Sequence, residues 1–276
     1  MKRITFISTI LYILAINYIL GSPVERMDNK DSLRIVITFN NCSSDTNLKA
    51  GPGFSAWIEY KERVLIFDTG SDYLTLLENM EKLNLDFMKV TDIFISHNHW
   101  DHIYGIPGIA GVKNFQVNTF IPKSSVDAII QQVPRLIYKE VNEFKELYPG
   151  IWSTGEMSSK FLNTTIAEQM IILETKEGLI VITGCSHPGI ETLINLVKGK
   201  FPGKTIKLLI GGFHLEKKTK EEIKLISDYL KETGIKAIAP SHCTGETAIE
   251  YFKNSNGVDY IQMFLGNEYK ILNVKL

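Results

Sequence analysis

The chain has 276 residues, of which 44% are hydrophobic and 22% are charged, and its formal net charge at pH 7 is −1. This length and composition fit an ordinary globular enzyme with one large domain or two small ones. The balanced charge gives no basic surface that would attract nucleic acid over long range, so no nucleic-acid partner is indicated.

The first 22 residues form a separate unit, in which two basic residues precede the apolar stretch Ile4–Leu20. This pattern is typical of a secretory signal peptide, and the small residues Gly21 and Ser22 favour cleavage there. Uncleaved, the segment would be an N-terminal membrane anchor, although it is slightly shorter than the roughly 20 residues of a spanning helix. We therefore expect an exported protein, periplasmic or extracellular, whose only membrane contact would be an uncleaved N-terminal segment.

A polar linker at 23–32 leads into one predicted domain at 33–276. Apolar runs bounded by turn residues predict strands at Arg34–Phe39, Phe54–Tyr60, Arg63–Phe67, Asp92–Ile95, Val117–Ile121, Gln169–Glu174, Leu179–Ile182, Ile206–Ile210, Lys236–Ala239, Ile261–Phe264 and Tyr269–Leu272. Helical patterns occur at Asp72–Leu83, Ser124–Tyr148 with a break at Pro134, Pro188–Lys198, Lys220–Thr233 and Glu246–Lys253. The order favours an α/β (α+β) fold, with two mixed sheets packed together and helices outside. We interpret residues 105–160 as a cap or insertion that shapes a substrate pocket.

A cluster of metal-ligand side chains follows the apolar run Ile93–Ile95: it contains His97, His99, Asp101 and His102. Imidazole and carboxylate are the ligands that zinc-like ions prefer. In an extended loop alternate side chains point the same way, so one ion can hardly collect all four. This favours two ions, one held by His97 and His99 and the other by Asp101 and His102, with further ligands from later in the chain.

The other three histidines, His187, His214 and His242, each follow a short apolar run. They are therefore expected just past the carboxyl ends of strands, where open α/β sheets place their ligand sites. Asp68 also closes a predicted strand, and it would either orient a ligand imidazole or form a turn.

Two cysteines lie next to these histidines, Cys185 and Cys243, and their role is open. The alternatives are a thiolate ligand, a disulfide between the two, and small buried residues in tight turns, and we favour the last of these. Thr244 and Gly245 can cap the helix that begins at Glu246. The free N–H groups of such a helix start would add an anion-binding site beside the metals.

The motif His-x-His-x-Asp-His at 97–102, the upstream Phe-Asp-Thr-Gly at 67–70 and the later single histidines resemble the metallo-β-lactamase superfamily. Gly-Cys-Ser-His-Pro-Gly at 184–189 and Gly-Gly-Phe-His-Leu at 211–215 resemble one branch, the 7,8-dihydropterin-6-yl-methyl-4-(β-D-ribofuranosyl)aminobenzene 5′-phosphate synthases of the tetrahydromethanopterin pathway. The resemblance implies an αββα sandwich with one or two metal ions at its edge.

The resemblance also implies a ligand set for two divalent ions, with Zn²⁺ first and Mn²⁺ or Fe²⁺ as alternatives. The first ion would be held by His97, His99 and His187, and the second by Asp101, His102 and His242. His214 stands near the place of the bridging aspartate of many superfamily members. An imidazole cannot bridge two ions as a carboxylate does, so His214 is expected to bind substrate or move a proton.

These residues predict a dinuclear metallo-hydrolase that acts on a small, anionic phosphoester or related ester through a metal-bound hydroxide. Asp101 would hold the nucleophile and His214 would stabilise the developing charge. The alternative is a synthase-like transferase that releases diphosphate. A second alternative is a non-catalytic exported protein that only binds metal, and a third is structural zinc in closed four-ligand sites.

Overall fold

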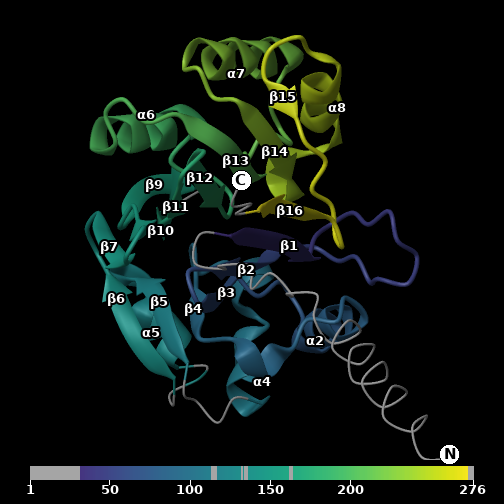
Figure 1. The fold of residues 1–276 in the computed structure, drawn as a ribbon, viewed down its shortest axis with the longest axis vertical. Coiled ribbons are helices and arrows are strands. Elements are labelled where there is room, and N and C mark those ends of the chain that lie inside the picture. The colour runs from purple at the N-terminus through teal and green to yellow at the C-terminus, as the bar shows by residue number, and fades with distance from the viewer. Residues whose placement is uncertain (1–31, 113–116, 132, 134–135, 162–163, 273–276) are drawn as a thin grey trace, which may run out of the picture.

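The computed structural model describes residues 32–112, 117–131, 133, 136–161 and 164–272. The segment 1–22 and linker residues 23–31 lie outside these ranges, so export stays a prediction. Within the described ranges, no helix has the length and apolar character that crossing a membrane requires. Two seven-stranded mixed sheets pack face to face, with helices on both outer faces (Figure 1). The predicted sandwich of two mixed sheets is confirmed.

The first sheet has the strand order β16-β1-β2-β3-β4-β5-β6. Its strands are β1 (Leu33–Phe39), β2 (Ser55–Tyr60), β3 (Arg63–Phe67), β4 (Asp92–Phe94), β5 (Asn118–Pro122), β6 (Ile137–Val141) and β16 (Glu268–Ile271). Strands β3 to β6 are parallel, whereas β16, β1, β2 and β3 pair antiparallel. The helical segments of this half are α2 (Tyr73–Lys82), η2 (Phe87–Lys89), α3 (Trp100–Ile103), α4 (Ile106–Val112), η3 (Lys123–Ser125) and α5 (Val126–Ile130).

The second sheet has the order β15-β14-β13-β12-β11-β8-β7, and β12 to β15 are parallel. Its strands are β7 (Lys145–Tyr148), β8 (Ile151–Ser153), β11 (Ile171–Thr175), β12 (Gly178–Thr183), β13 (Ile206–Gly212), β14 (Ala237–Ser241) and β15 (Asp259–Tyr260). A separate hairpin joins β9 (Met157–Phe161) and β10 (Thr164–Glu168). The helical segments are α6 (Ile190–Lys200), α7 (Lys220–Glu232), η4 (His242–Thr244) and α8 (Glu246–Asn254).

Three apolar layers hold the sandwich together. Because side chains alternate along a strand, Ile35 of β1 and Ile180 of β12 meet in the layer between the sheets. Val36 turns outward toward α2 and α4, and Val181 turns outward toward α6 and α7. Both sheets are therefore covered on both faces, which explains why their central strands are nearly continuous apolar runs.

The predicted long helix at Ser124–Tyr148 is wrong beyond residue 130, because the chain forms β6 and β7 there. The residue before a proline is pushed out of the α region, and β6 carries Ile137, Tyr138 and Val141, which suit a strand. The interpretation of residues 105–160 as a cap is also wrong: this region supplies β5 and β6 to one sheet and β7 and β8 to the other. No regular strand covers the predicted range 261–264.

The carboxyl ends of five strands place the polar side chains of the site. Asp68 follows β3, and the loop that carries His97 and His99 follows β4. His187, His214 and His242 come after β12, β13 and β14. Open α/β sheets expose strand ends for ligand binding at such an edge.

Candidate metal centre

The first group of nitrogen donors comprises His97, His99 and His187. Their ligand atoms lie within 4.8 Å of one another, and His97 Nε2 is 3.0 Å from His99 Nδ1. The His187 ring centroid lies 4.9 Å from each of the other two rings. The structure thus brings together the three residues that the sequence resemblance assigned to a first metal ion.

The second group comprises Asp101, His102 and His242, whose ligand atoms also lie within 4.8 Å of one another. Asp101 Oδ2 is 3.4 Å from His242 Nε2 and 4.0 Å from His102 Nε2. Asp101 and His102 lie on the short helix α3, so the extended conformation expected for this stretch does not continue past His99. The pairing of residues within each group is nevertheless the predicted one.

Asp68 connects the two groups from beneath. Its Oδ1 accepts a hydrogen bond from the Ser96 N–H at 2.7 Å, and its Oδ2 accepts from the Ser96 hydroxyl at 2.7 Å and from His102 Nδ1 at 2.7 Å. Since the Ser96 hydroxyl donates to Asp68, its oxygen accepts from His97 Nδ1 at 2.8 Å. These bonds hold Nδ1 of His97 and of His102 against protein partners, so that the Nε2 atom of each ring faces the donor groups.

Burial and neighbouring imidazoles keep most of the site unprotonated. Burial lowers the pKa of His97 well below its usual value, and burial together with His214 lowers the pKa of His187 to about 3. Burial opposes protonation of His102 as well, but the Asp68 carboxylate raises its pKa to about 9. Despite burial, the hydrogen bond from His242 lowers the pKa of Asp101.

The spacing of these donors fits tetrahedral metal coordination. Nitrogen and oxygen ligands about 2.0–2.1 Å from a tetrahedral ion lie roughly 3.3 Å apart. The distances of 3.0 Å between His97 and His99 and 3.4 Å between Asp101 and His242 are close to this value. Neutral imidazoles and an ionised carboxylate are also the donor types that zinc binds, and His102 becomes one when metal binding displaces its second proton. The residues present therefore fit divalent metal ions.

The backbone at the site is strained. Four non-glycine residues there have positive φ, namely Asp68 at 52°, Ser186 at 62°, His214 at 53° and His242 at 49°. Left-handed conformations cost such residues roughly 1–2 kcal/mol each. Strain of this kind is found at functional sites, where the surrounding structure holds a side chain in a required direction.

Glu168 is a buried site residue that the sequence reasoning did not assign. Its carboxylate accepts hydrogen bonds from the backbone N–H groups of Cys185, Ser186 and His187 at 2.8, 2.9 and 2.7 Å. Burial raises its pKa although these bonds oppose the rise. Glu168 therefore fixes the loop that presents His187. The pair Glu168-Gln169 belongs to the stretch that resembles the synthase branch, but nothing in the sequence assigns it a role.

Asn41 is a second unassigned residue. Its Oδ1 accepts from His242 Nδ1 at 2.8 Å and from the Gly53 N–H at 3.1 Å. This bond directs His242 Nε2 toward Asp101. No local pattern marks Asn41, which is separated from His242 by 201 positions in the sequence.

Replacing Asn41 by Leu is expected to weaken binding of one metal ion about 10–100-fold, because the orienting partner of His242 is lost. Asn41→Asp keeps an acceptor oxygen and is expected to stay near the parent affinity. Competition with a chromophoric zinc chelator measures both variants. Equal effects of the two substitutions would contradict an orienting role.

Thr244 and Gly245 have different roles from those predicted at the start of helix α8. Helix α8 has Gly245 as its N-cap, without a side-chain cap, so the predicted capping by Thr244 is wrong. The buried Thr244 hydroxyl instead accepts from the Phe213 N–H at 3.0 Å and donates to the Ser241 carbonyl at 2.7 Å. It has no hydrogen bond left for an anion, whereas Gly245 borders the cavity described next.

A cavity of about 910 Å³ opens over both groups of donors. Its inner wall includes His99, Asp101, His187, His214 and His242. Among the described residues of the range 105–160, none lines it. His214 is exposed at this wall, with its ring centroid 4.5 Å from that of His187, and a hydrogen bond with Cys243 raises its pKa.

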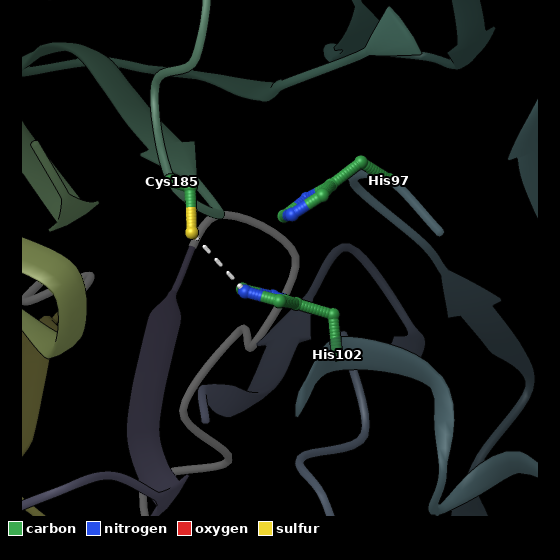
Figure 2. Close-up of side chains that lie close together, drawn as sticks. All are labelled: His97, His102 and Cys185. Carbon is green, nitrogen blue, oxygen red and sulfur yellow. Dashed lines mark hydrogen bonds between the residues drawn. The ribbon is translucent and has the colours of Figure 1, made fainter. Parts of the chain in front are cut away.

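All three cysteines are free thiols, so the disulfide considered from the sequence is not formed. Cys42 is exposed, Cys243 is half-buried and Cys185 is buried. Cys185 Sγ lies 3.3 Å from His102 Nε2 (Figure 2). It is thus in contact with the donor groups, which the favoured interpretation as a turn residue did not anticipate.

Comparison with known proteins agrees with this architecture. Residues 48–123 match the family model of the metallo-beta-lactamase superfamily. The 7,8-dihydropterin-6-methyl-4-(beta-D-ribofuranosyl)-aminobenzene-5′-phosphate synthase of Methanocaldococcus jannaschii is 28% identical over 258 residues, which cover 76% of this chain and 85% of that protein.

Solved structures show the same fold. A metal-dependent hydrolase of the β-lactamase superfamily superposes with a TM-score of 0.73 at 26% identity, covering 87% of this chain and 100% of that one. A diphosphatase of the PhnP family has a TM-score of 0.56 at 13% identity, with 87% and 97% coverage, and shares the fold alone. The matched segment 48–123 and the shared fold show that this chain is similar to metallo-β-lactamase-fold proteins, with the donor groups at its strand ends.

Proposed function

We propose that this protein is a dinuclear metal-dependent hydrolase that acts on a small phosphoester or related ester. The observation that carries the proposal is the pair of adjacent three-residue donor groups, His97/His99/His187 and Asp101/His102/His242, beneath one cavity. A structural zinc site would be closed by four protein ligands. Two groups of three donors leave room for substrate and suit a catalytic centre better.

Two divalent ions, zinc first and manganese or iron as alternatives, would supply Lewis acidity and would lower the pKa of a bound water. The chain's own residues complete the chemistry. Asp101 lies on the cavity wall with an ionised carboxylate, so it can hold the attacking water and accept a hydrogen bond from it. His214 faces the cavity with a raised pKa, so it can donate a proton to the leaving oxygen.

The cavity walls restrict the substrate class. The outer lining carries Glu216, Glu246 and Glu250, with Lys253 as a cation among them. An anionic ester therefore finds its positive partners at the floor of the cavity and not at its rim. This favours a small phosphoester with an uncharged or cationic outer end, and it disfavours a polyanion such as nucleic acid.

A second candidate is a synthase-like transferase that releases diphosphate. The observation that favours it is the similarity to the archaeal synthase, which extends over 85% of that relative. In this case the same donor groups would hold a diphosphate leaving group while the second substrate fills the outer cavity. The two candidates differ in their products: hydrolysis gives an alcohol with phosphate or a phosphomonoester, and the transferase gives a coupled product with diphosphate.

The test is turnover by chelator-treated protein before and after reloading with zinc. We expect zinc to restore hydrolysis of a chromogenic phosphodiester or phosphomonoester, and the chelated protein to be inactive. The same samples are incubated with a dihydropterin diphosphate and a ribofuranosylaminobenzene phosphate, with diphosphate release as the readout. Activity in the second assay alone would favour the transferase. Two bound ions without turnover in either assay would favour a non-catalytic metal-binding protein.

A further inference from the structure

Cys185 occupies the boundary between the two donor groups. The rings of His97 and His102, one from each group, have centroids only 4.2 Å apart. Cys185 Sγ lies within 4.8 Å of the ligand atoms of both residues. Figure 2 shows the three side chains converging from separate segments of the chain. A sulfur atom at this place is within reach of an ion held by either group.

The orientation of His102 makes this contact suitable for metal binding. Its Nδ1 donates to Asp68, so its Nε2 atom points toward Cys185 Sγ at 3.3 Å. A thiolate and an imidazole on one tetrahedral zinc ion, at about 2.3 and 2.0–2.1 Å, are separated by roughly 3.5 Å. The observed separation is close to this value without any movement of the backbone.

The backbone of Cys185 is also held in place. The Cys185 backbone N–H donates to the buried carboxylate of Glu168 at 2.8 Å. Cys243 groups with Cys185 and His214 but not with His97 or His102, its sulfur lies 3.6 Å from the backbone carbonyl of Cys185, and Cys42 is exposed. Cys185 is therefore the cysteine whose sulfur faces the boundary between the groups.

The other described donors of the two groups are imidazoles and the Asp101 carboxylate, and Asp101 groups only with His102 and His242. His214 also faces the cavity, but a neutral imidazole has a single lone pair for a metal. A thiolate sulfur has several lone pairs and can bind two ions at once. We propose that Cys185 Sγ is a metal ligand shared by the two ions; this rests on the dinuclear site of the proposed function.

Two properties follow from a thiolate in this position. Metal binding must displace the thiol proton to solvent, because the thiolate is the form that coordinates. A soft sulfur ligand also favours zinc, iron or cobalt over magnesium or calcium, and it places manganese behind zinc and iron among the ions of the proposed function. The site is therefore expected to discriminate against the harder ions.

Cobalt substitution tests the proposal independently of activity. The chelator-treated protein is titrated with Co²⁺ while the near-ultraviolet sulfur-to-cobalt charge-transfer band is recorded. We expect the band to grow through both the first and the second equivalent, because each ion contacts the same sulfur. We expect Cys185→Ser to lose the band, and Cys42→Ser and Cys243→Ser to keep it.

A double variant, Cys42→Ser with Cys243→Ser, leaves Cys185 as the sole thiol. It tests the role of Cys185 without replacing it, so the test does not depend on correct folding of Cys185→Ser. It is expected to show the full band, and bound cobalt is expected to slow modification of its thiol by a disulfide reagent. Two bound cobalt ions without a band, or a band complete at one equivalent, would overturn the shared ligand and leave the dinuclear site standing. Failure to bind cobalt at all would overturn the proposed function itself.

Discussion

The purified protein is expected to bind two zinc ions per chain, and the variants His99→Ala and His242→Ala are each expected to bind one. Each substitution removes a donor from only one group, so the other group keeps its three side chains. Loss of a ligand is expected to lower the affinity for that ion at least about 100-fold, because removal of a partner that only orients a ligand already lowers metal affinity about 10–100-fold. Elemental analysis after dialysis gives the stoichiometry.

His214→Ala is the matched control for this experiment. It removes an imidazole from the same cavity wall, but we place His214 outside both donor groups, so the variant is expected to keep two ions. A parent protein with one ion, or a full complement of zinc in both His99→Ala and His242→Ala, would rule out the dinuclear assignment. Loss of an ion from His214→Ala would instead make this histidine a ligand.

Asp68→Asn is expected to reduce both stability and metal binding. The carboxylate is fully buried and accepts three hydrogen bonds, two from Ser96 and one from His102. An amide NH₂ in place of Oδ2 cannot accept from His102 Nδ1, so the imidazole must change tautomer and place a proton on the Nε2 that faces the metal site. We expect the free energy of unfolding to fall by about 2–4 kcal/mol. Affinity for one ion is expected to fall about 10–100-fold.

Asp92→Asn separates the two effects. Asp92 is equally buried, but it lies at the start of β4, away from the site, where it accepts hydrogen bonds from Arg63 and Tyr148. This variant is expected to lose stability and to keep both ions. Urea unfolding of the metal-free proteins and zinc titration of the folded proteins measure the two properties. Normal zinc affinity in Asp68→Asn would show that Asp68 has no orienting role.

Secondary structure predicted from the sequence agrees with the structure where apolar periodicity is strong, and it disagrees where the periodicity is weak. Helix α7 was expected at Lys220–Thr233 and occurs at Lys220–Glu232, because it has a capping box and one clear apolar face. The region after Pro134 was assigned to a helix and forms strands. Its exposed residues Lys139 and Glu140 suit a helix, so local preference was ambiguous, and pairing with β5 decided the outcome.

The sequence by itself determined the candidate ligands, because imidazole and carboxylate side chains repeated at strand ends have few other uses, and parallel strands carry those ends to one edge. Only the tertiary structure decided what surrounds them. Asn41 meets His242 across 201 positions and Cys185 meets His102 across 83. Such contacts depend on strand register and on the packing of the two sheets, which no local pattern encodes.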